Sequence, residues 1–267
     1  MVAALLTLLV ILFGWPMLRP IIAAKLSAAF RRTTTIGSLG RRGGTLLHPT
    51  LVLQDVHVLQ PTWAGPGDIA SVQTVVIELP LLPLLAGRVR PDSIAVTRLH
   101  LRLSRTSDGR LNWTDRTHPI GPPVLGNLSI ADGQLDIIDA KSARKFTARF
   151  ALDGLGFRLS GRGQLGQRPL RLTASGAPIN PRRPAAPWRF RVALSSPRVR
   201  INLNGVADHS LDFDHFTAHL AARGKDLHDL DKVIEAGLPG TQPFVVHSEV
   251  RHDAPDWMLD RIAGTLG

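Results

Sequence analysis

The densest group of side chains that could bind a metal ion lies between residues 208 and 219. On a strand, Asp212 and Asp214 share one face, whereas His215 and His219 share a face only on a helix. Because no single secondary structure aligns a complete ligand set, we interpret the group as an acidic surface patch, with a metal site as the alternative. The full group is Asp208, His209, Asp212, Asp214, His215 and His219.

The stretch Gly161–Gly166 matches the GxGxxG pattern of dinucleotide-binding loops by its letters. Such a loop begins a helix that holds the pyrophosphate, and an acidic residue about 20 positions later binds the ribose. Here Pro169 and an alternating pattern follow, and residues 181–190 contain no acidic residue. We therefore expect a glycine-rich hairpin turn, and we predict no cofactor.

Nucleophilic catalysis has little support in this chain. Ser195 and Ser196 lack the flanking glycines of a nucleophile elbow. The absence of cysteine excludes thiolate catalysis, disulfides and cysteine-ligated zinc. We therefore expect a protein that is not an enzyme, and a glycan or lipid hydrolase is the weakest alternative.

The elements that position the side chains are predicted to be mainly β-strands. The 267 residues include no tyrosine, 24 glycines and 20 prolines, a composition typical of many short aliphatic strands separated by turns. In the stretches 94–103, 188–194 and 199–203, apolar residues alternate with polar or basic ones. This pattern predicts an antiparallel meander with one apolar face and one polar, solvent-exposed face.

Two details of the strand pattern can be predicted. The alternation in 51–58 predicts a phase slip near Asp55, and Asp132-Gly133 is expected to form a turn between 128–130 and 134–139. The residues predicted to line the apolar face are Leu99, Leu101, Leu103, Trp188, Phe190, Val192, Leu194, Val199, Ile201 and Leu203.

The net charge of +11 is concentrated in the middle of the chain, where residues 151–200 hold ten arginines and one aspartate. These arginines lie singly along alternating strands, so we interpret them first as a solvated face. Anionic lipid headgroups are the alternative partner, and nucleic acid is the least favoured. We predict no nucleic-acid partner.

The N-terminus contains a candidate membrane anchor. Val2–Leu18 has no charged side chain and spans roughly 25 Å as a helix, just short of a ~30 Å hydrocarbon core. We predict a transmembrane anchor at residues 1–24 and a basic juxtamembrane connector at 25–47. A helix from Pro20 to about Phe30 has an apolar side that suits the bilayer surface. A cleaved signal peptide is the alternative to the anchor.

Two further segments break the strand pattern. The stretch Leu81–Gly87 is predicted to form one helical turn, a hydrophobic plug at the end of the sheet that contains Leu81, Leu82, Leu84 and Leu85. Residues 225–237 are predicted to form a short amphipathic helix that ends at Gly237. The pattern stops in mid-strand at residue 267, so we expect the β domain at 48–267 to be truncated at its C-terminus.

The order of these features resembles the AsmA family of bacterial envelope proteins across roughly residues 1–140. An apolar anchor and a basic connector precede a strand pair that flanks Leu84-Leu85-Ala86-Gly87. The second strand is followed by Asp108-Gly109-Arg110-Leu111-Asn112-Trp113, and a later Asp-Gly pair is Asp132-Gly133. The resemblance implies a single inner-membrane anchor and an elongated, curved open β-groove with a few short helices. It implies no catalytic residues.

The resemblance also implies where the protein lies and what it does. It implies a single-pass protein of the bacterial inner membrane with its body in the periplasm. The basic residues that follow the anchor would, by the positive-inside rule alone, place the body in the cytoplasm. The function implied is moving or holding phospholipid in the groove for outer-membrane biogenesis, with other envelope proteins as further candidate partners. A scaffold that affects outer-membrane protein insertion, without carrying lipid, is the alternative.

Overall fold

The protein is built on one open β-sheet of thirteen strands. The computed structural model describes residues 15–45, 48–80, 91–113, 127–165, 168–180, 183, 186–229, 237–254 and 256–267. The helices are η1 (Trp15–Leu18), α2 (Arg19–Phe30) and η2 (Thr62–Ala64). The strands are β1 (Thr34–Gly44), β2 (Pro49–Leu59), β3 (Asp68–Glu78), β4 (Ser93–Arg105), β5 (Asn127–Asp139), β6 (Arg144–Asp153), β7 (Gly156–Leu165), β8 (Arg168–Gly176), β9 (Trp188–Ser195), β10 (Val199–Ala207), β11 (His215–Gly224), β12 (Phe244–Asp253) and β13 (Asp256–Leu266).

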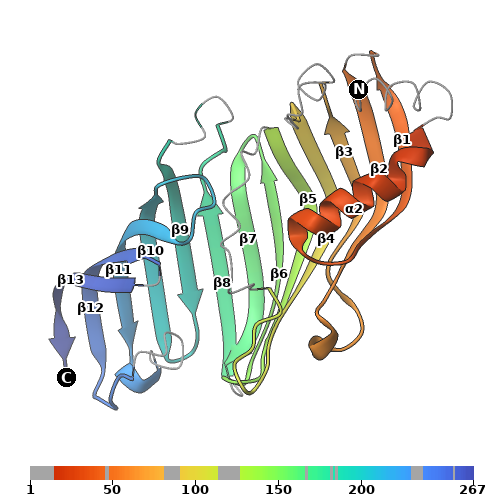
Figure 1. The fold of residues 1–267 in the computed structure, drawn as a ribbon. Helices are drawn as coiled ribbons and strands as arrows, with labels where there is room; N and C mark the ends of the chain where they lie inside the picture. The colour runs from red at the N-terminus through yellow and green to blue at the C-terminus, as the bar shows by residue number, and fades with distance from the viewer. Residues whose placement is uncertain are drawn as a thin grey trace.

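The strands lie across the sheet in chain order, from β1 at one edge to β13 at the other (Figure 1). The predicted mainly β, open architecture is therefore confirmed. The prediction of a wholly antiparallel sheet is wrong at one pair, because β4 and β5 run parallel. The long segment 106–126 separates these two strands, and a connection of that length can return the chain to the end at which β4 began.

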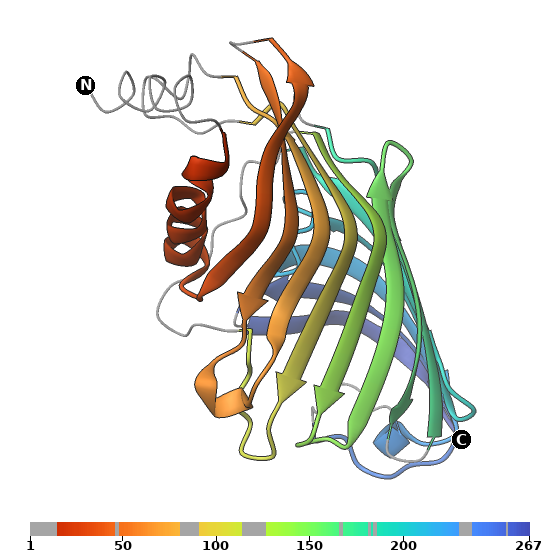
Figure 2. The ribbon, with the colours of Figure 1, turned by 90° about the vertical axis from the view of Figure 1, so that its right-hand side faces the viewer.

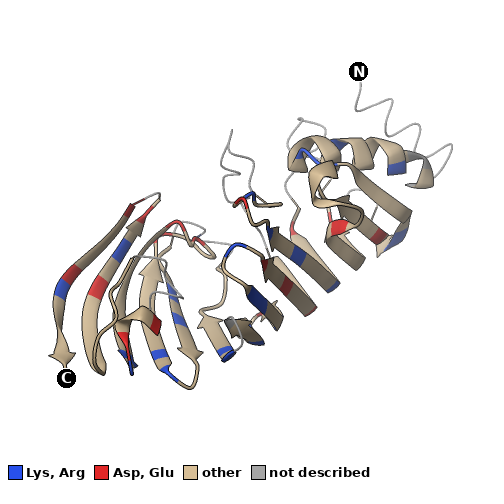
Figure 3. Ribbon diagram, turned by 90° about the horizontal axis from the view of Figure 1, so that it is seen from below, with Lys and Arg blue, Asp and Glu red and all other residues tan. Residues whose placement is uncertain are grey.

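The sheet is curved, and α2 lies on its hollow side (Figures 2 and 3). We call this side the concave face and the opposite side the convex face. Ile36, Leu53 and Val56 of β1 and β2 point to the concave face, where they pack against Ile22 and Leu26 of α2. The predicted helix is confirmed, but its apolar side contacts the sheet instead of a bilayer surface.

The N-terminal region differs from its predicted organisation. Strand β1 and the second half of α2 fall within residues 25–47, for which the sequence predicts a connector. Strand β1 pairs with β2 and completes the sheet edge. Among the described residues, no helix is long and apolar enough to cross a membrane. Most of the predicted anchor, residues 1–24, lies outside the described part of the chain. Of the helix predicted at 225–237, residues 225–229 and 237 are described, and 227–229 of them are helical.

A line of bulges crosses the first half of the sheet. Asp55, Arg98 and Asp132 have φ values of 52°, 53° and 54°, in the left-handed region that single bulge residues adopt. The strand registers place Asp55 and Arg98 on either side of Gln73, and the Arg98 guanidinium donates a 2.6 Å hydrogen bond to the Gln73 amide oxygen. Each bulge lets apolar side chains on both sides of it point to the same face.

The bulges confirm one prediction made from the sequence and contradict another. The phase slip near Asp55 is confirmed, since Leu53 and Val56 are both buried in the same cluster. The turn predicted at Asp132-Gly133 is wrong, because β5 continues through both residues as one bulged strand. A bulge and a turn both use an aspartate with positive φ followed by glycine, so the local sequence does not separate them.

Large aromatic rings on the concave face lie over glycines of neighbouring strands. Phe150 lies opposite Gly133, Phe190 lies opposite both Gly176 and Gly205, and Phe244 lies opposite Gly224. A Cβ atom added to any of these glycines would stand under 3.0 Å from an aromatic ring atom. Glycine therefore leaves the space in which each ring can lie flat against the sheet.

Gly161 and Gly163 belong to the same arrangement. They lie inside β7, opposite Ala148 and Phe146, and a Cβ at Gly161 would stand 2.3 Å from the Phe146 ring. The predicted glycine-rich hairpin turn is therefore wrong for these two residues. The GxGxxG letters arise from strand glycines that accommodate a cross-strand phenylalanine.

Candidate functional site

The concave face is an apolar surface that continues from strand to strand. The cross-strand pairs Val75–Val96, Leu159–Ala174 and Val192–Leu203 illustrate how the register keeps apolar residues in line. Most of these side chains are half-buried, since neighbouring strands shield their sides while the face itself is open. The half-buried members include Val72, Val75, Ile77, Ile94, Val96, Leu99, Leu101, Leu103, Ile130, Leu135, Ile137, Phe146, Phe150, Leu159, Leu172, Val192, Leu194, Ile201 and Leu203.

The structure brings all ten predicted lining residues to the concave face, but they differ in burial. Trp188, Phe190 and Val199 are buried at 2%, 5% and 3% exposure, and they form clusters with neighbouring strands. These three residues hold the sheet together and leave little surface for a ligand. The other seven are half-buried and present surface: Leu99, Leu101, Leu103, Val192, Leu194, Ile201 and Leu203.

Sequence reasoning missed the residues that join the two predicted groups. Strands β5 to β8 lie between β4 and β9 and contribute Leu135, Phe146, Phe150, Leu159 and Leu172 to the same face. Their alternation is visible in the sequence, yet the bulge at Asp132 shifts its phase. The sequence shows the alternation of apolar and polar residues within each strand, but it does not show the register between neighbouring strands.

One end of the concave face has a charged rim. Asp139 lies between Arg105 and Arg144, with N–O distances of 3.6 and 4.0 Å. At β8 and β10, the buried carboxylate of Asp229 is paired with Arg168 and with Arg198, the latter at 3.3 Å. Each group places two guanidinium groups around one carboxylate.

The predicted plug residues Leu81, Leu82, Leu84 and Leu85 lie outside the described residues. The other motif segment, 108–113, is described. Its buried Asn112 accepts a 2.8 Å hydrogen bond from the Ser104 backbone and donates one of 3.0 Å to the Arg102 carbonyl. The side chain thus satisfies the β4 backbone beyond its last pair with β3 at Leu101. Its own carbonyl accepts a hydrogen bond from Arg32, next to α2.

Comparison with known proteins agrees with this geometry. The AsmA family model matches residues 1–142, which is more than half of the chain. The chain belongs to the AsmA family. A search of curated proteins found no match. Membership of the AsmA family indicates an envelope-associated protein. The hydrogen bonds of Asn112 to β4 indicate a structural role for the Asp-Gly-Arg-Leu-Asn-Trp motif.

The convex face of this AsmA protein is strongly basic over β6 to β11, and Figure 3 shows blue bands on these strands. Arginines lie directly opposite one another at Arg162–Arg171 and Arg200–Arg223. Like charges at opposed positions of a sheet repel each other. The exposed arginines here are Arg149, Arg158, Arg162, Arg171, Arg189, Arg191, Arg200 and Arg223.

Of the Asp208–His219 group, Asp208, His209, Asp212 and Asp214 lie in the turn between β10 and β11, and His215 and His219 lie in β11. The Asp212 carboxylate accepts hydrogen bonds from the backbone N–H groups of Asp214 and His215, at 3.0 and 3.1 Å. Burial acts to raise the pKa of Asp212, but these bonds and the imidazoles of His209 and His215 outweigh it and lower the pKa. Within the described residues, no three metal-ligating side chains gather to hold an ion. The carboxylate therefore stabilises a turn.

Ser196 has a similar structural role. Its hydroxyl accepts hydrogen bonds from the backbone N–H groups of Arg198 and Val199, at 3.4 and 3.1 Å. These bonds shape the tight turn between β9 and β10. The hydroxyl of Ser196 is thus part of the hydrogen bonding of this turn.

Proposed function

We propose that the protein holds or moves phospholipid with its acyl chains on the concave face, in support of the outer membrane. The observation that carries this proposal is that every strand from β3 to β10 contributes half-buried apolar side chains to the concave face. Such a surface is costly to leave in water and complements a hydrocarbon chain. The rim beside it contains guanidinium groups, which are suitable donors to a phosphate headgroup.

The dimensions of the face suit a ligand that slides or lies along it. Twelve inter-strand spacings give the thirteen-stranded sheet a width of roughly 57 Å. Full burial of one CH₂ group stabilises by about 0.8 kcal/mol, so a 16-carbon chain gains at most on the order of 12 kcal/mol. An open face covers only part of the chain, which keeps binding reversible, as transfer requires.

We place the protein at the bacterial inner membrane, held by one anchor at residues 1–24, with residues 48–267 in the periplasm. The supports are the charge-free run at 2–18 and AsmA family membership. Added protease should therefore cleave the body in spheroplasts that retain an intact inner membrane. Protection of the body until the membrane is lysed would place it in the cytoplasm.

Lipid occupancy of the intact protein tests the proposed function. After mild detergent extraction of the full chain, native mass spectrometry should show bound phospholipid. The double variant L101D/L172D places two carboxylates on the concave face and should lower occupancy at least about tenfold, which corresponds to about 1.4 kcal/mol. The matched control T173D/N202D adds the same charge on the convex face, at two exposed positions, and should retain lipid.

The outcomes separate lipid carriage from the scaffold hypothesis. Lipid-free protein from several mild extractions would favour a scaffold that acts on outer-membrane protein insertion. Equal lipid loss in both double variants would show that the detected lipid is not held by the concave face. Thermal unfolding of each variant confirms that a loss of lipid does not reflect a loss of fold.

A further inference from the structure

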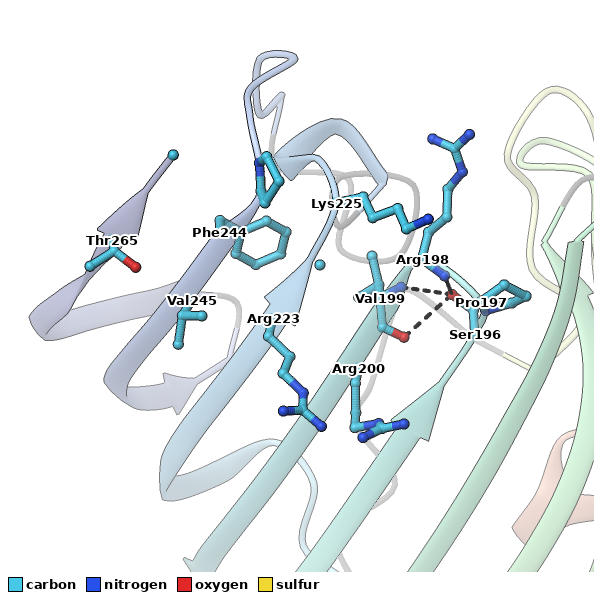
Figure 4. A pocket seen from close by; sticks show the side chains of 13 residues that line it. Ser196, Pro197, Arg198, Val199, Arg200, Arg223, Lys225, Phe244, Val245 and Thr265 are labelled. Atoms are coloured by element: carbon cyan, nitrogen blue, oxygen red, sulfur yellow. Dashed lines mark hydrogen bonds between the residues drawn. The ribbon is translucent and has the colours of Figure 1, made fainter.

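An open cavity of about 380 Å³ lies at the ends of β10 to β13 and is lined by four basic side chains (Figure 4). Arg200 and Arg223 occupy directly opposed positions on β10 and β11. Arg198 and Lys225 lie one step further toward the strand ends, where the Lys225 backbone N–H donates to the Arg198 carbonyl at 3.0 Å. Two opposed pairs of like charge therefore follow one another along the two strands, and Figure 4 shows Lys225 and Arg198 extending away from Arg200 and Arg223.

Few of the basic side chains in this cavity are paired with a carboxylate of the described residues. Arg198 is paired with the buried carboxylate of Asp229 at 3.3 Å. In the part of the chain that the structure describes, Arg200, Arg223 and Lys225 form no salt bridge with a carboxylate. Opposed like charges destabilise a sheet unless an anion neutralises them. The positive charges of Arg200, Arg223 and Lys225 are therefore not balanced by carboxylates of the described residues.

The backbone around the cavity is held in place before any ligand binds. Ser196 fixes the turn that precedes β10 by accepting hydrogen bonds from Arg198 and Val199, which Figure 4 shows as dashed lines. Phe244 is buried at 2% exposure and packs with Val199 behind the cations. Figure 4 shows Arg200 and Arg223 extending in the same direction from adjacent strands. Two guanidinium groups so placed can form paired hydrogen bonds to tetrahedral oxygens.

We propose that Arg200 and Arg223 form a binding site for a phosphate group, supplied by a phospholipid headgroup or by a soluble phosphate compound. The site lies near the group formed by Asp229 and its two arginines. It does not depend on acyl chains in the groove, because Arg200 and Arg223 are on the convex face. The phosphate site could therefore exist even if the concave face bound no lipid.

Titration of the full chain in neutral maltoside micelles with inorganic phosphate tests the proposal. At constant ionic strength, isothermal titration should detect phosphate binding that chloride does not reproduce. The double variant R200Q/R223Q should weaken phosphate binding at least about tenfold. The control R162Q/R171Q removes an equally opposed arginine pair from the same face and should change the Kd less than twofold.

A conservative variant separates geometry from charge. R200K/R223K retains both charges but loses the planar guanidinium donors, so its Kd should lie between those of wild type and R200Q/R223Q. All of these positions are exposed, and the variants should unfold at temperatures close to wild type. Wild-type binding no stronger for phosphate than for chloride would overturn the proposal, as would equal weakening in the R162Q/R171Q control.

Competition identifies the source of the phosphate group. The titration is repeated in micelles that contain phosphatidylglycerol or, as a control, diacylglycerol, which has the same acyl chains without phosphate. A raised apparent Kd only with phosphatidylglycerol supports the site and identifies a lipid headgroup. An unchanged Kd with both lipids supports the site and identifies a soluble phosphate compound.

Discussion

The replacement Gly176→Ala tests whether strand glycines make room for the aromatic rings of the concave face. A Cβ atom at this position would stand 1.9 Å from Cζ2 of Trp188 and 2.4 Å from its Cη2. The indole is 2% exposed, and its Nε1–H donates a 2.7 Å hydrogen bond to the Ala177 carbonyl. Its ring also lies 6.1 Å from Phe190 and 6.4 Å from Phe157, so it cannot move without disturbing its neighbours.

The magnitude follows from these contacts. Overpacking a filled core costs about 1–3 kcal/mol, and loss of the indole hydrogen bond adds about 1 kcal/mol. The free energy of unfolding should therefore fall by about 2–4 kcal/mol, which lowers the Tm by roughly 4–16 °C for a chain of this size. Thermal unfolding followed by circular dichroism provides the measurement.

Gly40→Ala is the matched control for this change. Gly40 also lies in a strand, β1, but a Cβ added there meets nothing within 4 Å. Alanine should leave stability unchanged or raise it by up to about 1 kcal/mol, because it restricts the unfolded chain. If Gly176→Ala unfolded at or above the temperature of Gly40→Ala, the argument that glycine leaves space for the ring would be refuted.

Two further predictions concern polar groups that hold the sheet. Asn112→Ala should lower the free energy of unfolding by about 2–4 kcal/mol and speed hydrogen exchange at the Ser104 amide, because it leaves two β4 backbone groups without partners. Unchanged exchange would refute the motif's structural role. Burial acts to raise the pKa of Asp136, but hydrogen bonds from His100 and Thr147 outweigh it and lower the pKa below 3.8. Asp136 therefore contributes stability above pH 3.8 that is lost as the pH falls through its lowered pKa. Urea unfolding of Asp136→Asn at pH 6 and pH 3 should show a smaller acid loss than wild type; an identical loss would contradict this assignment.

Local patterns in the sequence predict most of the strands but not how they pair. The alternation at 188–194 forms β9 almost to the residue, whereas that at 199–203 forms only the first part of β10, which continues to Ala207. The parallel pairing of β4 and β5 was missed because it depends on where the segment 106–126 returns the chain. Strands β1 and β11 were missed because glycine-rich and histidine-containing stretches show weak alternation, and their pairing with neighbours decides their conformation.

The candidate site, like the fold, can be predicted from the sequence only in part. The sequence predicts an apolar face, since each strand displays its own alternation. It does not predict that this face continues from β4 to β9, because the bulges at Arg98 and Asp132 shift the phase within strands. The opposition of Arg200 to Arg223 could not be predicted either, since cross-strand neighbours are 23 residues apart in the chain and are fixed only by register.

Site-by-site photo-crosslinking along β4 and β10 can show whether phospholipid lies on the concave face. A benzophenone amino acid replaces one residue at a time in the full chain in cells, and mass spectrometry detects phospholipid adducts. If phospholipid lies on the concave face, adducts should form at the concave positions Leu101, Leu103 and Leu203. None should form at the exposed convex neighbours Arg102 and Asn202. Adducts of equal yield at both sets, or at neither set, would contradict the assignment of the concave face as the lipid-binding surface.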